Sequence, residues 1–433
     1  MTIPGARGLK SIGRSFVCSI LEKQVVQLRQ RHNFTVVAVV GSVGKTSTKA
    51  AVAQVLSAAK PVRYQSGNYN DRVTVPLLFF GEPLPALWNI LAWLGIFRRN
   101  KKQIRQANFP YDYVVLELGT DEPGDISEFA YTKPEIAVVT ALTPEHMSQF
   151  KTLQGVVTEE LSVLKYSAQG LINIDESDPK DLQGITTPYK TYSMQDAKAD
   201  FFATSQDEAE LRGQSLRVTA ADNTLQVHTA LLGSPGAKAV LAAVAVATLL
   251  GIEPELISRG VADLPPFPGR LQRLNGIEDS MLIDDTYNSS PAAVSAALNV
   301  LESFKAPQRI AILGSMNQMG DMAESAHQEV GSYCDPAQID YVVTVGRGAN
   351  TWLAPAARQR GCKVQECNSP HQAGAFVASI LKPKAVVLAK GSQDGVYAEE
   401  ALKPLLRDSA DQVKLVRQSP YWLAIKRKQF SDI

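Results

Sequence analysis

The residues with the clearest chemical potential lie between positions 41 and 47, in the segment Gly-Ser-Val-Gly-Lys-Thr-Ser. Its two glycines let backbone N–H groups approach phosphate oxygens, and a helix starting at Lys45 adds the positive end of its dipole. Lys45 can reach the β- and γ-phosphates of a nucleotide, and the hydroxyl of Thr46 can bind Mg²⁺. The spacing is tighter than in the standard phosphate-binding motif, which has a glycine where this chain has Val39. An ordinary strand-turn-helix corner needs neither the lysine nor the hydroxyl, so we expect nucleotide contacts from Gly41, Ser42, Gly44, Lys45, Thr46 and Ser47.

Two further residues are candidates for a metal ion beside that loop. Glu117 stands in the apolar run 113–118, where a carboxylate is costly unless it meets a cation or strong donors. At the end of a parallel strand beside a phosphate loop, Mg²⁺ is its natural partner. His146 follows the apolar run 136–140. A lone loop histidine is usually a surface residue, but this position favours a metal or phosphate role.

The elements that must position these side chains are short buried strands. Five of the six residues in 35–40 are apolar and four are valine, which is too short and too β-branched for a helix. Further strands are expected at 113–118, 136–140 and 171–175, and short strands alternate with polar turns over 180–232. The proline-rich segment 264–269 reads as a linker, and a second series of βα pairs follows it.

The predicted fold class is therefore α/β. We expect a P-loop ATPase domain with a parallel sheet and a small β appendage over 35–266, preceded by an amphipathic helix within 1–34. A Rossmann-like α/β domain should occupy 267–433. No G-x-G-x-x-G follows the first strand of that domain, which argues against a dinucleotide site there.

Composition limits the other function classes. The chain has 433 residues and a formal net charge of +1, so no overall charge attracts nucleic acid. Its four cysteines are scattered and none has zinc-ligand spacing, which suits reduced thiols in a cytoplasmic protein. The N-terminal residues lack the apolar core and cleavage site of a signal peptide.

One segment raises the question of a membrane. Residues 84–97 are almost wholly apolar, contain Trp88 and Trp93, and are followed by the basic run 98–102. The segment is too short to cross a bilayer. A buried helix is the default interpretation, and a helix lying in the interface at the inner face of the membrane, over residues 84–102, is the alternative.

With these residues in place, the chain resembles the Mur ligases, the ATP-dependent amide-forming superfamily of peptidoglycan synthesis, and within it the MurF branch that adds D-alanyl-D-alanine. The resemblance rests on several motifs in order, spanning roughly residues 35–395. They are GSVGKTSTK at 41–49, GNYNDRVTVP at 67–76, ELGTDEPGDI at 117–126, TPEHMSQFKTLQGV at 143–156, INID at 172–175, PGRLQ at 268–272, DDTYNSSP at 284–291, ILGSMNQMGD at 312–321 and LAKGSQDG at 388–395.

The resemblance implies a ligase that uses ATP and Mg²⁺. A substrate carboxylate attacks the γ-phosphate to give an acyl phosphate and ADP, and an amine then displaces phosphate. The substrates implied are a small-molecule or lipid-linked cell-wall precursor and an amino acid or dipeptide. By similarity, the catalytic residues are Lys45, His146, Glu160 and Arg270, and the metal ligands are Thr46, Glu117, His146 and Glu160. The nucleotide is bound by the phosphate loop together with Asn173, Asp285, Tyr287 and Asn288. The residues that face substrate are Asn68, Asn70, Lys390 and Ser392.

Three departures from the family pattern carry expectations of their own. Only about 34 residues precede the first strand, so the N-terminal domain that grips a UDP-sugar is expected to be absent. Glu160 stands where family members carry a carbamylated lysine, and its carboxylate could replace the carbamate at Mg²⁺. The segment 235–239 replaces the H-N-x-x-N that helps to read adenine. Two alternatives stay open: a non-catalytic nucleotide-binding partner of a cell-wall protein, and a sister ligase of the folylpolyglutamate or cyanophycin type.

Overall fold

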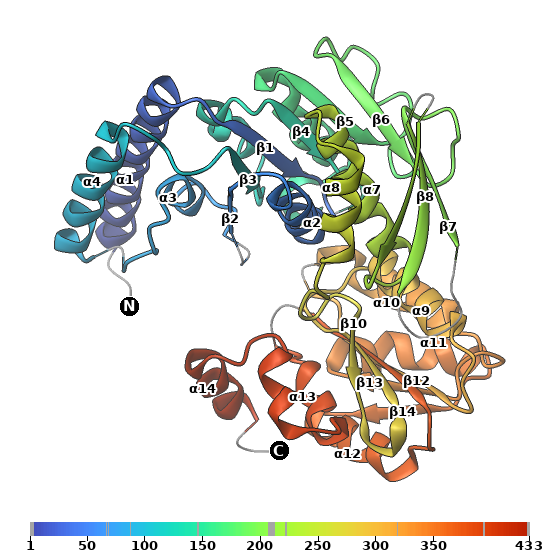
Figure 1. The fold of residues 1–433 in the computed structure, drawn as a ribbon. Coiled ribbons are helices and arrows are strands. Elements are labelled where there is room, and N and C mark those ends of the chain that lie inside the picture. The colour runs from blue at the N-terminus through green and yellow to red at the C-terminus, as the bar shows by residue number, and fades with distance from the viewer. Residues whose placement is uncertain are drawn as a thin grey trace. The chain divides into compact units, whose positions relative to one another are not determined.

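The computed structural model describes residues 4–65, 67, 69–86, 88–144, 147–206, 213–220, 223–317, 319–392 and 395–430, with only the backbone for 4–13 and 148. The chain divides into two compact units (Figure 1). The first comprises Met1–Gln206, Ser215–Thr229 and Lys238–Leu264, and the second comprises Asp207–Gln214, Ala230–Ala237 and Pro265–Ile433. The main crossing between the units thus falls at the start of the proline-rich segment.

Among the described residues, the first unit contains a nine-stranded sheet in the order β2-β3-β1-β4-β5-β6-β7-β8-β9. The pairs from β2 to β7 are parallel, and β7 and β8 are antiparallel. In the register of the central pair, Ala38 lies opposite Leu116 and Val39 opposite Glu117, so the phosphate loop and Glu117 leave the sheet at the same edge. The strands are β1 Thr35–Val40, β2 Val62–Tyr64, β3 Tyr113–Glu117, β4 Ile136–Val139, β5 Gln169–Asn173, β6 Tyr189–Ser193, β7 Phe201–Gln206, β8 Gln214–Ala220 and β9 Asn223–Thr229.

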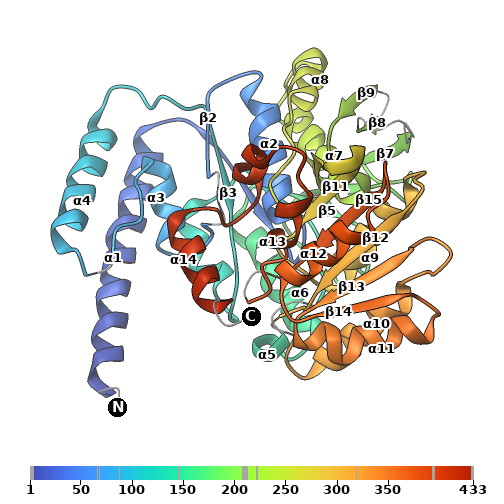
Figure 2. The same ribbon diagram turned by 90° about the horizontal axis from the view of Figure 1, so that it is seen from below.

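Helices cover this sheet, and α1 (Pro4–Arg31) and α4 (Ile90–Arg105) lie beside it (Figure 1). The core beneath them is built from the valines of β1, β3 and β4, almost all of them fully buried. The helices are α1 Pro4–Arg31, α2 Lys45–Ser57, α3 Thr74–Phe80, α4 Ile90–Arg105, α5 Met147–Phe150, α6 Leu153–Leu161, α7 Gly233–Leu249, which passes from one unit to the other, and α8 Pro254–Ala262. α1 and α4 lie side by side in both ribbon views (Figures 1 and 2).

The second unit is a six-stranded sheet, within the described residues, in the order β10-β11-β15-β12-β13-β14. Only the edge pair β10–β11 is antiparallel. Its strands are β10 Gln272–Asn275, β11 Met281–Asp285, β12 Arg309–Gly314, β13 Tyr341–Val345, β14 Val364–Cys367 and β15 Val386–Lys390. Its helices are α9 Pro291–Ser303, α10 Ala323–Tyr333, α11 Ala354–Gln359, α12 Pro370–Ile380, α13 Glu399–Leu402 and α14 Pro420–Gln429.

The α/β class predicted from the sequence is confirmed, with corrections in detail. The short strands expected in a small β appendage are β6 to β9, and they continue the main sheet at one edge. The helix expected over the apolar segment begins only at Ile90, where the side chain of Asn89 caps it by accepting the N–H of Ala92 at 3.1 Å. It then runs through the basic stretch to Arg105, because lysine, arginine and glutamine favour helix. No helix in the described parts of the chain has the length and apolar character needed to span a membrane.

Candidate active site

The loop between β1 and α2 has the backbone of a phosphate cradle. Gly41 and Gly44 adopt φ angles of 120° and 89°, which L-residues rarely adopt. A Cβ atom at position 41 would also overlap the side chain of Thr140. Gly44 is the N-cap of α2, so Lys45, Thr46 and Ser47 form the first turn, whose backbone N–H groups lie beyond the reach of intrahelical carbonyls. This is the arrangement that anions bind at helix N-termini.

The segment after β4 braces this loop. Ser42 donates its backbone N–H to the carbonyl of Ala141 at 2.8 Å and its hydroxyl to the carbonyl of Thr143 at 2.7 Å. The hydroxyl of Thr140 donates to the carbonyl of Val43 at 2.7 Å. The side chain of Ser42, which we expected at the nucleotide, therefore holds the loop in shape. The segment that braces the loop leads directly to positions 145 and 146, and His146 itself lies outside the described residues.

Lys45 is folded over the loop that precedes it. Its ammonium group donates to the carbonyl of Gly41 and, at 3.3 Å, to that of Ser42. A phosphate in the cradle would compete with these carbonyl oxygens for the same ammonium group. Contact of Lys45 with the β- and γ-phosphates stays a prediction.

Glu117 has a partner that the sequence analysis missed. Its carboxylate lies 3.0 Å from the ammonium of Lys49, and both side chains are only 1% exposed. Lys49 also donates to the carbonyl of Gly67 at 2.7 Å. The expected cation beside Glu117 is therefore supplied by the chain itself, one helical turn after Lys45. Position 49 lies within the recognised motif, and a lysine one turn beyond Lys45 on the same helix face was the available signal.

The other oxygen of Glu117 remains suited to a metal ion. The hydroxyl of Thr46 lies 3.2 Å from it, and the side-chain amide of Asn70 donates to it at 3.4 Å. One or two protein oxygens are enough for a Mg²⁺ ion whose other ligands are phosphates and water. The described residues contain no group of three or more His, Cys, Asp or Glu side chains placed to hold a metal. Thr46 and Glu117 thus fit a magnesium site that depends on the nucleotide.

Glu160 contacts the loop backbone. Its carboxylate is 1% exposed and accepts the N–H of Gly41 at 2.8 Å. The neighbouring Glu159 accepts the N–H groups of Gly124 and Ile126 at 2.8 and 2.7 Å. Helix α6 therefore anchors the loops that follow β1 and β3. A metal-ligand role for Glu160 stays a prediction, and the contact with Gly41 is the role that the structure adds.

Asn173 and Asn70 hold turns at the same edge of the sheet. The side chain of Asn173 is buried at the end of β5 and accepts the N–H of Asp175 at 3.0 Å. The backbone carbonyl of Asn70 accepts the N–H of Gly119 at 3.0 Å. Asn68 lies outside the described residues. Nearby, Lys238 of the replaced adenine motif forms an ion pair with Glu176 at 2.5 Å.

The second unit gathers most of its predicted site residues where β11 and β15 end. The guanidinium of Arg270 lies 4.4 Å from the ring centroid of Tyr287. The N–H of Tyr287 donates to the carbonyl of Gly269 at 3.1 Å, and the N–H of Leu271 donates to the carboxylate of Asp285 at 3.2 Å. The segment 269–271 is thus held against 285–287, and Arg270 and Tyr287 are placed as a pair.

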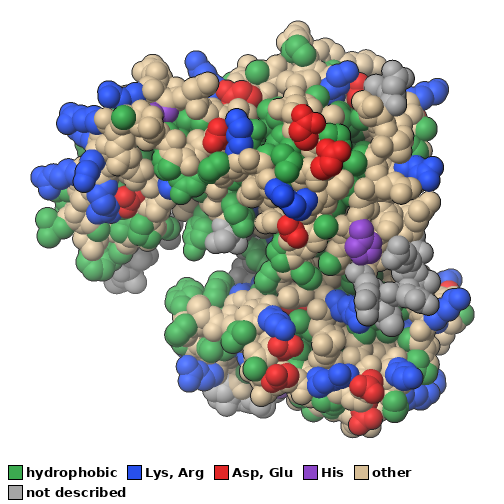
Figure 3. Space-filling model, viewed as in Figure 1, with side chains coloured by type: hydrophobic (Ala, Val, Ile, Leu, Met, Phe, Trp, Pro, Cys, Tyr) green, Lys and Arg blue, Asp and Glu red, His purple; other side chains and the backbone are tan. Residues whose placement is uncertain are grey.

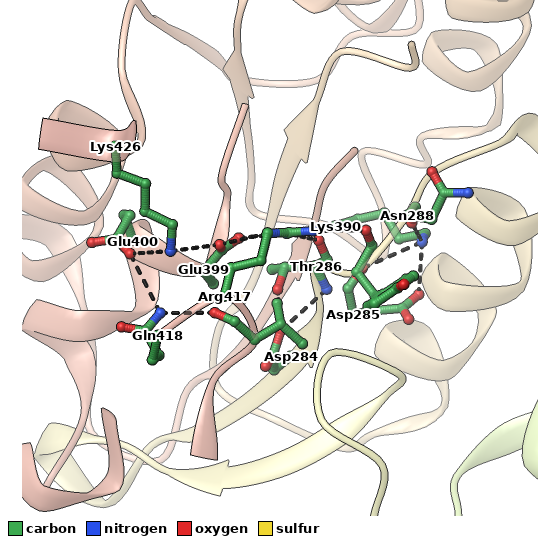
Figure 4. Close-up of polar contacts among 12 residues, drawn as sticks. Asp284, Asp285, Thr286, Asn288, Lys390, Glu399, Glu400, Arg417, Gln418 and Lys426 are labelled. Carbon is green, nitrogen blue, oxygen red and sulfur yellow. Dashed lines mark hydrogen bonds and ion pairs between the residues drawn. The ribbon is translucent and has the colours of Figure 1, made fainter. Parts of the chain in front are cut away.

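Lys390 and Ser392 are more enclosed than expected. Lys390 is 3% exposed, pairs with Asp285 at 3.1 Å and donates to the carbonyl of Asn288 (Figure 4). Ser392 is fully buried, and its hydroxyl accepts the N–H of Asn317 at 2.9 Å. Both side chains thus brace loops, and a role of either one in facing substrate stays a prediction. Any contact with substrate would first require these bonds to break.

A buried charge network fixes the loop that carries Tyr287. Arg417 donates to the carbonyls of Thr286 and Tyr287 at 2.6 and 3.0 Å and pairs with Glu399 at 2.7 Å (Figure 4). Lys426 pairs with both Glu399 and Glu400, at 2.8 and 2.7 Å. The basic segment 417–428 therefore contributes two buried cations to the second unit.

Asp284 lies in the same network. Its side chain is fully buried and accepts the hydroxyl of Thr286 at 2.6 Å. Burial raises the pKa of Asp284 to about 7, because its charged form loses solvation. The ionisation state of this group can thus change near neutral pH.

Comparisons with known proteins agree with this geometry. The family model for the Mur ligase middle domain matches residues 100–247, and the model for the Mur ligase glutamate ligase domain matches residues 269–393. The UDP-N-acetylmuramoyl-tripeptide–D-alanyl-D-alanine ligase of Escherichia coli is 29% identical over 74% of this chain and 66% of its own length. The ligase of the same name from Synechocystis is 26% identical over 84% of this chain and 73% of its own length. The chain spans just under two thirds of the length of the E. coli relative and 63% of that of the Bacillus subtilis relative.

Solved structures show the same fold. The MurF ligase of Thermotoga maritima, in complex with ADP, superposes with a TM-score of 0.72 at 20% identity, covering 92% of this chain and 84% of that one. MurF of Acinetobacter baumannii gives 0.71 at 21% identity, covering 86% and 77%. The folylpolyglutamate synthase of T. maritima gives 0.60 at 14% identity, covering 92% and 95%. Since the two domain models together match more than half of the chain, and the structural neighbours share its fold, the chain belongs to the Mur ligase family.

Proposed function

We propose that the chain is an ATP- and Mg²⁺-dependent ligase that joins an amino acid or dipeptide to a carboxylate of a peptidoglycan precursor. The observation that carries the proposal is the phosphate loop at the start of α2, with Lys45 at the loop and Thr46 against Glu117 at the adjoining strand end. A loop of this kind binds the triphosphate, and family membership selects amide formation from the reactions that such loops serve.

The reaction proceeds in two steps. A carboxylate oxygen of the precursor attacks the γ-phosphorus of ATP, and ADP leaves with the electron pair of the broken P–O bond. The amine nitrogen then attacks the acyl carbon, loses a proton, and inorganic phosphate leaves. Mg²⁺ bound by Thr46 and Glu117 would neutralise charge on the phosphates.

The chain's own residues position the nucleotide and stabilise charge. The first-turn N–H groups of α2 and the Lys45 ammonium would hold the β- and γ-phosphates. Arg270, held over the ring of Tyr287, is the proposed cation for the transferred phosphoryl group. His146 is retained as a proposed metal ligand.

Relatives suggest the identity of the two substrates. Eight curated relatives carry the name UDP-N-acetylmuramoyl-tripeptide–D-alanyl-D-alanine ligase, which names a muramoyl tripeptide and the dipeptide D-alanyl-D-alanine. We therefore propose a muramoyl peptide as the acid and D-alanyl-D-alanine as the first amine to test. A lipid-linked form of the acid, reached by the enzyme at the cytoplasmic face of the membrane, is the finer version of this proposal.

The test is a screen of acid and amine pairs. The full chain is incubated with ATP and Mg²⁺, and release of ADP and phosphate is measured together with the mass of the product. We expect release only when both an acid and an amine are present, and loss of turnover in Lys45→Met. Lys60→Met is the matched control, since Lys60 lies past the end of the same helix and pairs with Asp112 where both side chains are about half exposed.

Other outcomes separate the alternatives. Tight ADP binding without turnover for any soluble or lipid-linked muramoyl acid would favour the non-catalytic nucleotide-binding protein. Turnover with a folate-type or polyaspartate acid instead would favour the sister ligases. Both results would contradict the proposed substrates.

A further inference from the structure

Helices α1 and α4 form a parallel pair beside the sheet of the first unit (Figures 1 and 2). The side-chain amide of Gln24 in α1 donates to the carbonyl of Phe97 in α4 at 2.9 Å, and Asn100 donates to Gln24 at 2.8 Å. Arg31, at the end of α1, donates to the carbonyl of Arg105, at the end of α4, at 3.4 Å. The two helices therefore point the same way.

One end of this pair exposes large apolar side chains. Trp88 is 83% exposed and Leu91 82%, and the other members are also at least two-fifths exposed. Contiguous apolar surface of this kind marks an interaction site more often than scattered single residues do. Hydrophobic side chains gather at the lower end of the helix pair in Figure 3. We call this set the apolar tip: Phe16, Trp88, Ile90, Leu91 and Leu94.

The same face of α4 becomes basic further along. Leu91 and Leu94 are followed at helical spacing by Arg98, Lys101, Lys102 and Arg105, all exposed, and we call these four the cationic stripe. Helix α4 contains no acidic residue. Its remaining arginine, Arg99, pairs with Glu82 at 2.5 Å. A helix rises about 1.5 Å per residue, so Leu91 and Lys101 are roughly 15 Å apart along the axis.

We propose that the apolar tip inserts into the surface of a bilayer that contains anionic lipids, with the cationic stripe at the level of the headgroups. Interfacial helices bury apolar side chains about 5–10 Å into the boundary between headgroups and acyl chains. Tryptophan favours that boundary, and lysine and arginine are attracted to anionic headgroups. The order along α4, apolar first and basic next, matches the order of these layers.

The geometry selects a tilted, tip-first contact over a helix lying flat. A flat helix would need apolar side chains along its whole length on the lipid side. In α4 the apolar residues of the middle and end, Trp93, Ile96 and Ile104, are buried in the protein. Among the described apolar side chains of α4, those of the apolar tip are the ones more than two-fifths exposed, which favours a tip-first orientation over a flat one.

The charge pattern also separates a bilayer from other occupants. In a two-fold contact of α4 with the α4 of a second copy, no acidic residue of that helix would face either cationic stripe, because α4 contains none. An acidic protein would match the stripe but would not explain the exposed tryptophan and leucine beside it. An anionic bilayer matches both features at once.

Membrane docking of the apolar tip does not depend on the proposed ligase activity. If the acid substrate is lipid-linked, the docked tip would bring the enzyme to the surface that holds it. Vesicle binding is measured without substrates, so failure of binding and failure of turnover are separate results.

The experiment is flotation of the full chain with vesicles of phosphatidylcholine alone or with about 30 mol % phosphatidylglycerol, the second of which carries a negative surface potential. The tip variant is Trp88→Ser with Leu91→Ser, and the charge variant is Arg98→Gln, Lys101→Gln and Lys102→Gln. Val413→Ser, which removes an 82% exposed apolar residue from the second unit, is the control for the tip. Lys305→Gln, Lys382→Gln and Lys384→Gln together, three exposed cations of the second unit, are the control for charge.

We expect binding to the anionic vesicles that weakens as salt is raised. Compared with the original chain, the charge variant should bind the anionic vesicles about 100-fold more weakly, because each lost cation weakens binding about fivefold. The tip variant should bind them at least about tenfold more weakly than the original chain. Both controls should bind like the original chain. Brominated lipids should quench tryptophan fluorescence in the original chain and much less in Trp88→Phe.

Three results would overturn the proposal. One is equal flotation of the tip and charge variants with the original chain. The second is no binding to either vesicle. The third is a concentration-dependent dimer, seen by light scattering, that Leu91→Ser abolishes, since the tip would then be a contact between copies. Circular dichroism of each variant confirms that the substituted chain is folded.

Discussion

Replacing Lys49 by methionine tests the buried pair on which the geometry of the nucleotide site depends. Methionine keeps most of the volume of lysine and removes its charge. Because Lys49 and Glu117 are each 1% exposed and 3.0 Å apart, the variant leaves a carboxylate enclosed without its cation. Removing one member of a buried ion pair typically costs about 3–5 kcal/mol. The bond from Lys49 to the carbonyl of Gly67 is lost as well.

The assay is hydrogen exchange of the backbone amides in β1 and β3, because a two-unit chain does not unfold as a single two-state system. Amides that exchange when this unit opens should do so roughly 150 to 5,000 times faster in Lys49→Met, the range that corresponds to 3–5 kcal/mol. The matched control is Lys60→Met. Lys60 and Asp112 are about half exposed and 3.4 Å apart, so its loss should change exchange by less than about fivefold.

A second variant separates loss of the pair from loss of lysine packing. In Lys49→Met with Glu117→Leu, no charge is left enclosed, and most of the stability should return. If Lys49→Met alone exchanges within fivefold of the original chain, the pair does not stabilise this unit and the reasoning fails. If the double variant is as unstable as the single one, the effect comes from packing instead of charge.

Three further predictions concern single residues. Gly41→Ala should weaken ADP binding at least about tenfold by calorimetry, because position 41 has φ of 120° and no room for a Cβ beside Thr140; unchanged affinity would contradict the cradle. Glu160→Gln keeps an acceptor for the N–H of Gly41 and should bind ADP without metal as the original chain does, whereas Glu160→Leu should bind ADP about 5- to 150-fold more weakly. Equal weakening of ADP binding in both variants would show that Glu160 acts through its charge or through a metal ion instead of by bracing the loop. Because burial raises the pKa of Asp284, the contribution of this group to the free energy of unfolding is present at low pH and is lost as pH rises from about 4 to about 7. Urea unfolding of the second unit should therefore depend less on pH in Asp284→Asn than in the original chain. The same pH dependence in both chains would show that Asp284 does not titrate in this range.

The features that could be predicted from sequence are those set by nearby residues. The valines of β1 and the glycines of the loop after it determine a buried strand, a left-handed turn and a helix start within a dozen positions. The end of β3 was likewise identified from its apolar run, and the resemblance to a known family brought Arg270 and Tyr287 into one hypothesis. The structure then places those two side chains in contact.

The features that were missed depend on partners distant in sequence. In the sequence Lys49 looks like an exposed helical lysine, because lysine is rarely buried in proteins. Its burial is explained by its bond to Glu117, which lies 68 positions away in the sequence. Arg417 and Lys426 lie in a basic C-terminal stretch, and the residues that hold them inside, Glu399 and Glu400, belong to another helix. Lys390 is likewise buried, and its counter-charge, Asp285, lies on another strand. In each case the sequence shows a charge, and only the fold shows its counter-charge.

Lys49 also bears on how a triphosphate could bind beside a buried carboxylate. An uncompensated Glu117 at the edge of the loop would repel the phosphates across a poorly screened interior, where unit charges interact far more strongly than in water. With Lys49 on one carboxylate oxygen, the local charge is close to zero before any ligand arrives, and the other oxygen still faces the hydroxyl of Thr46. A divalent cation binding there would make the site positive overall, which favours the nucleotide. Loss of Lys49 should therefore weaken ADP binding most when Mg²⁺ is absent, because the metal ion can partly replace the missing charge.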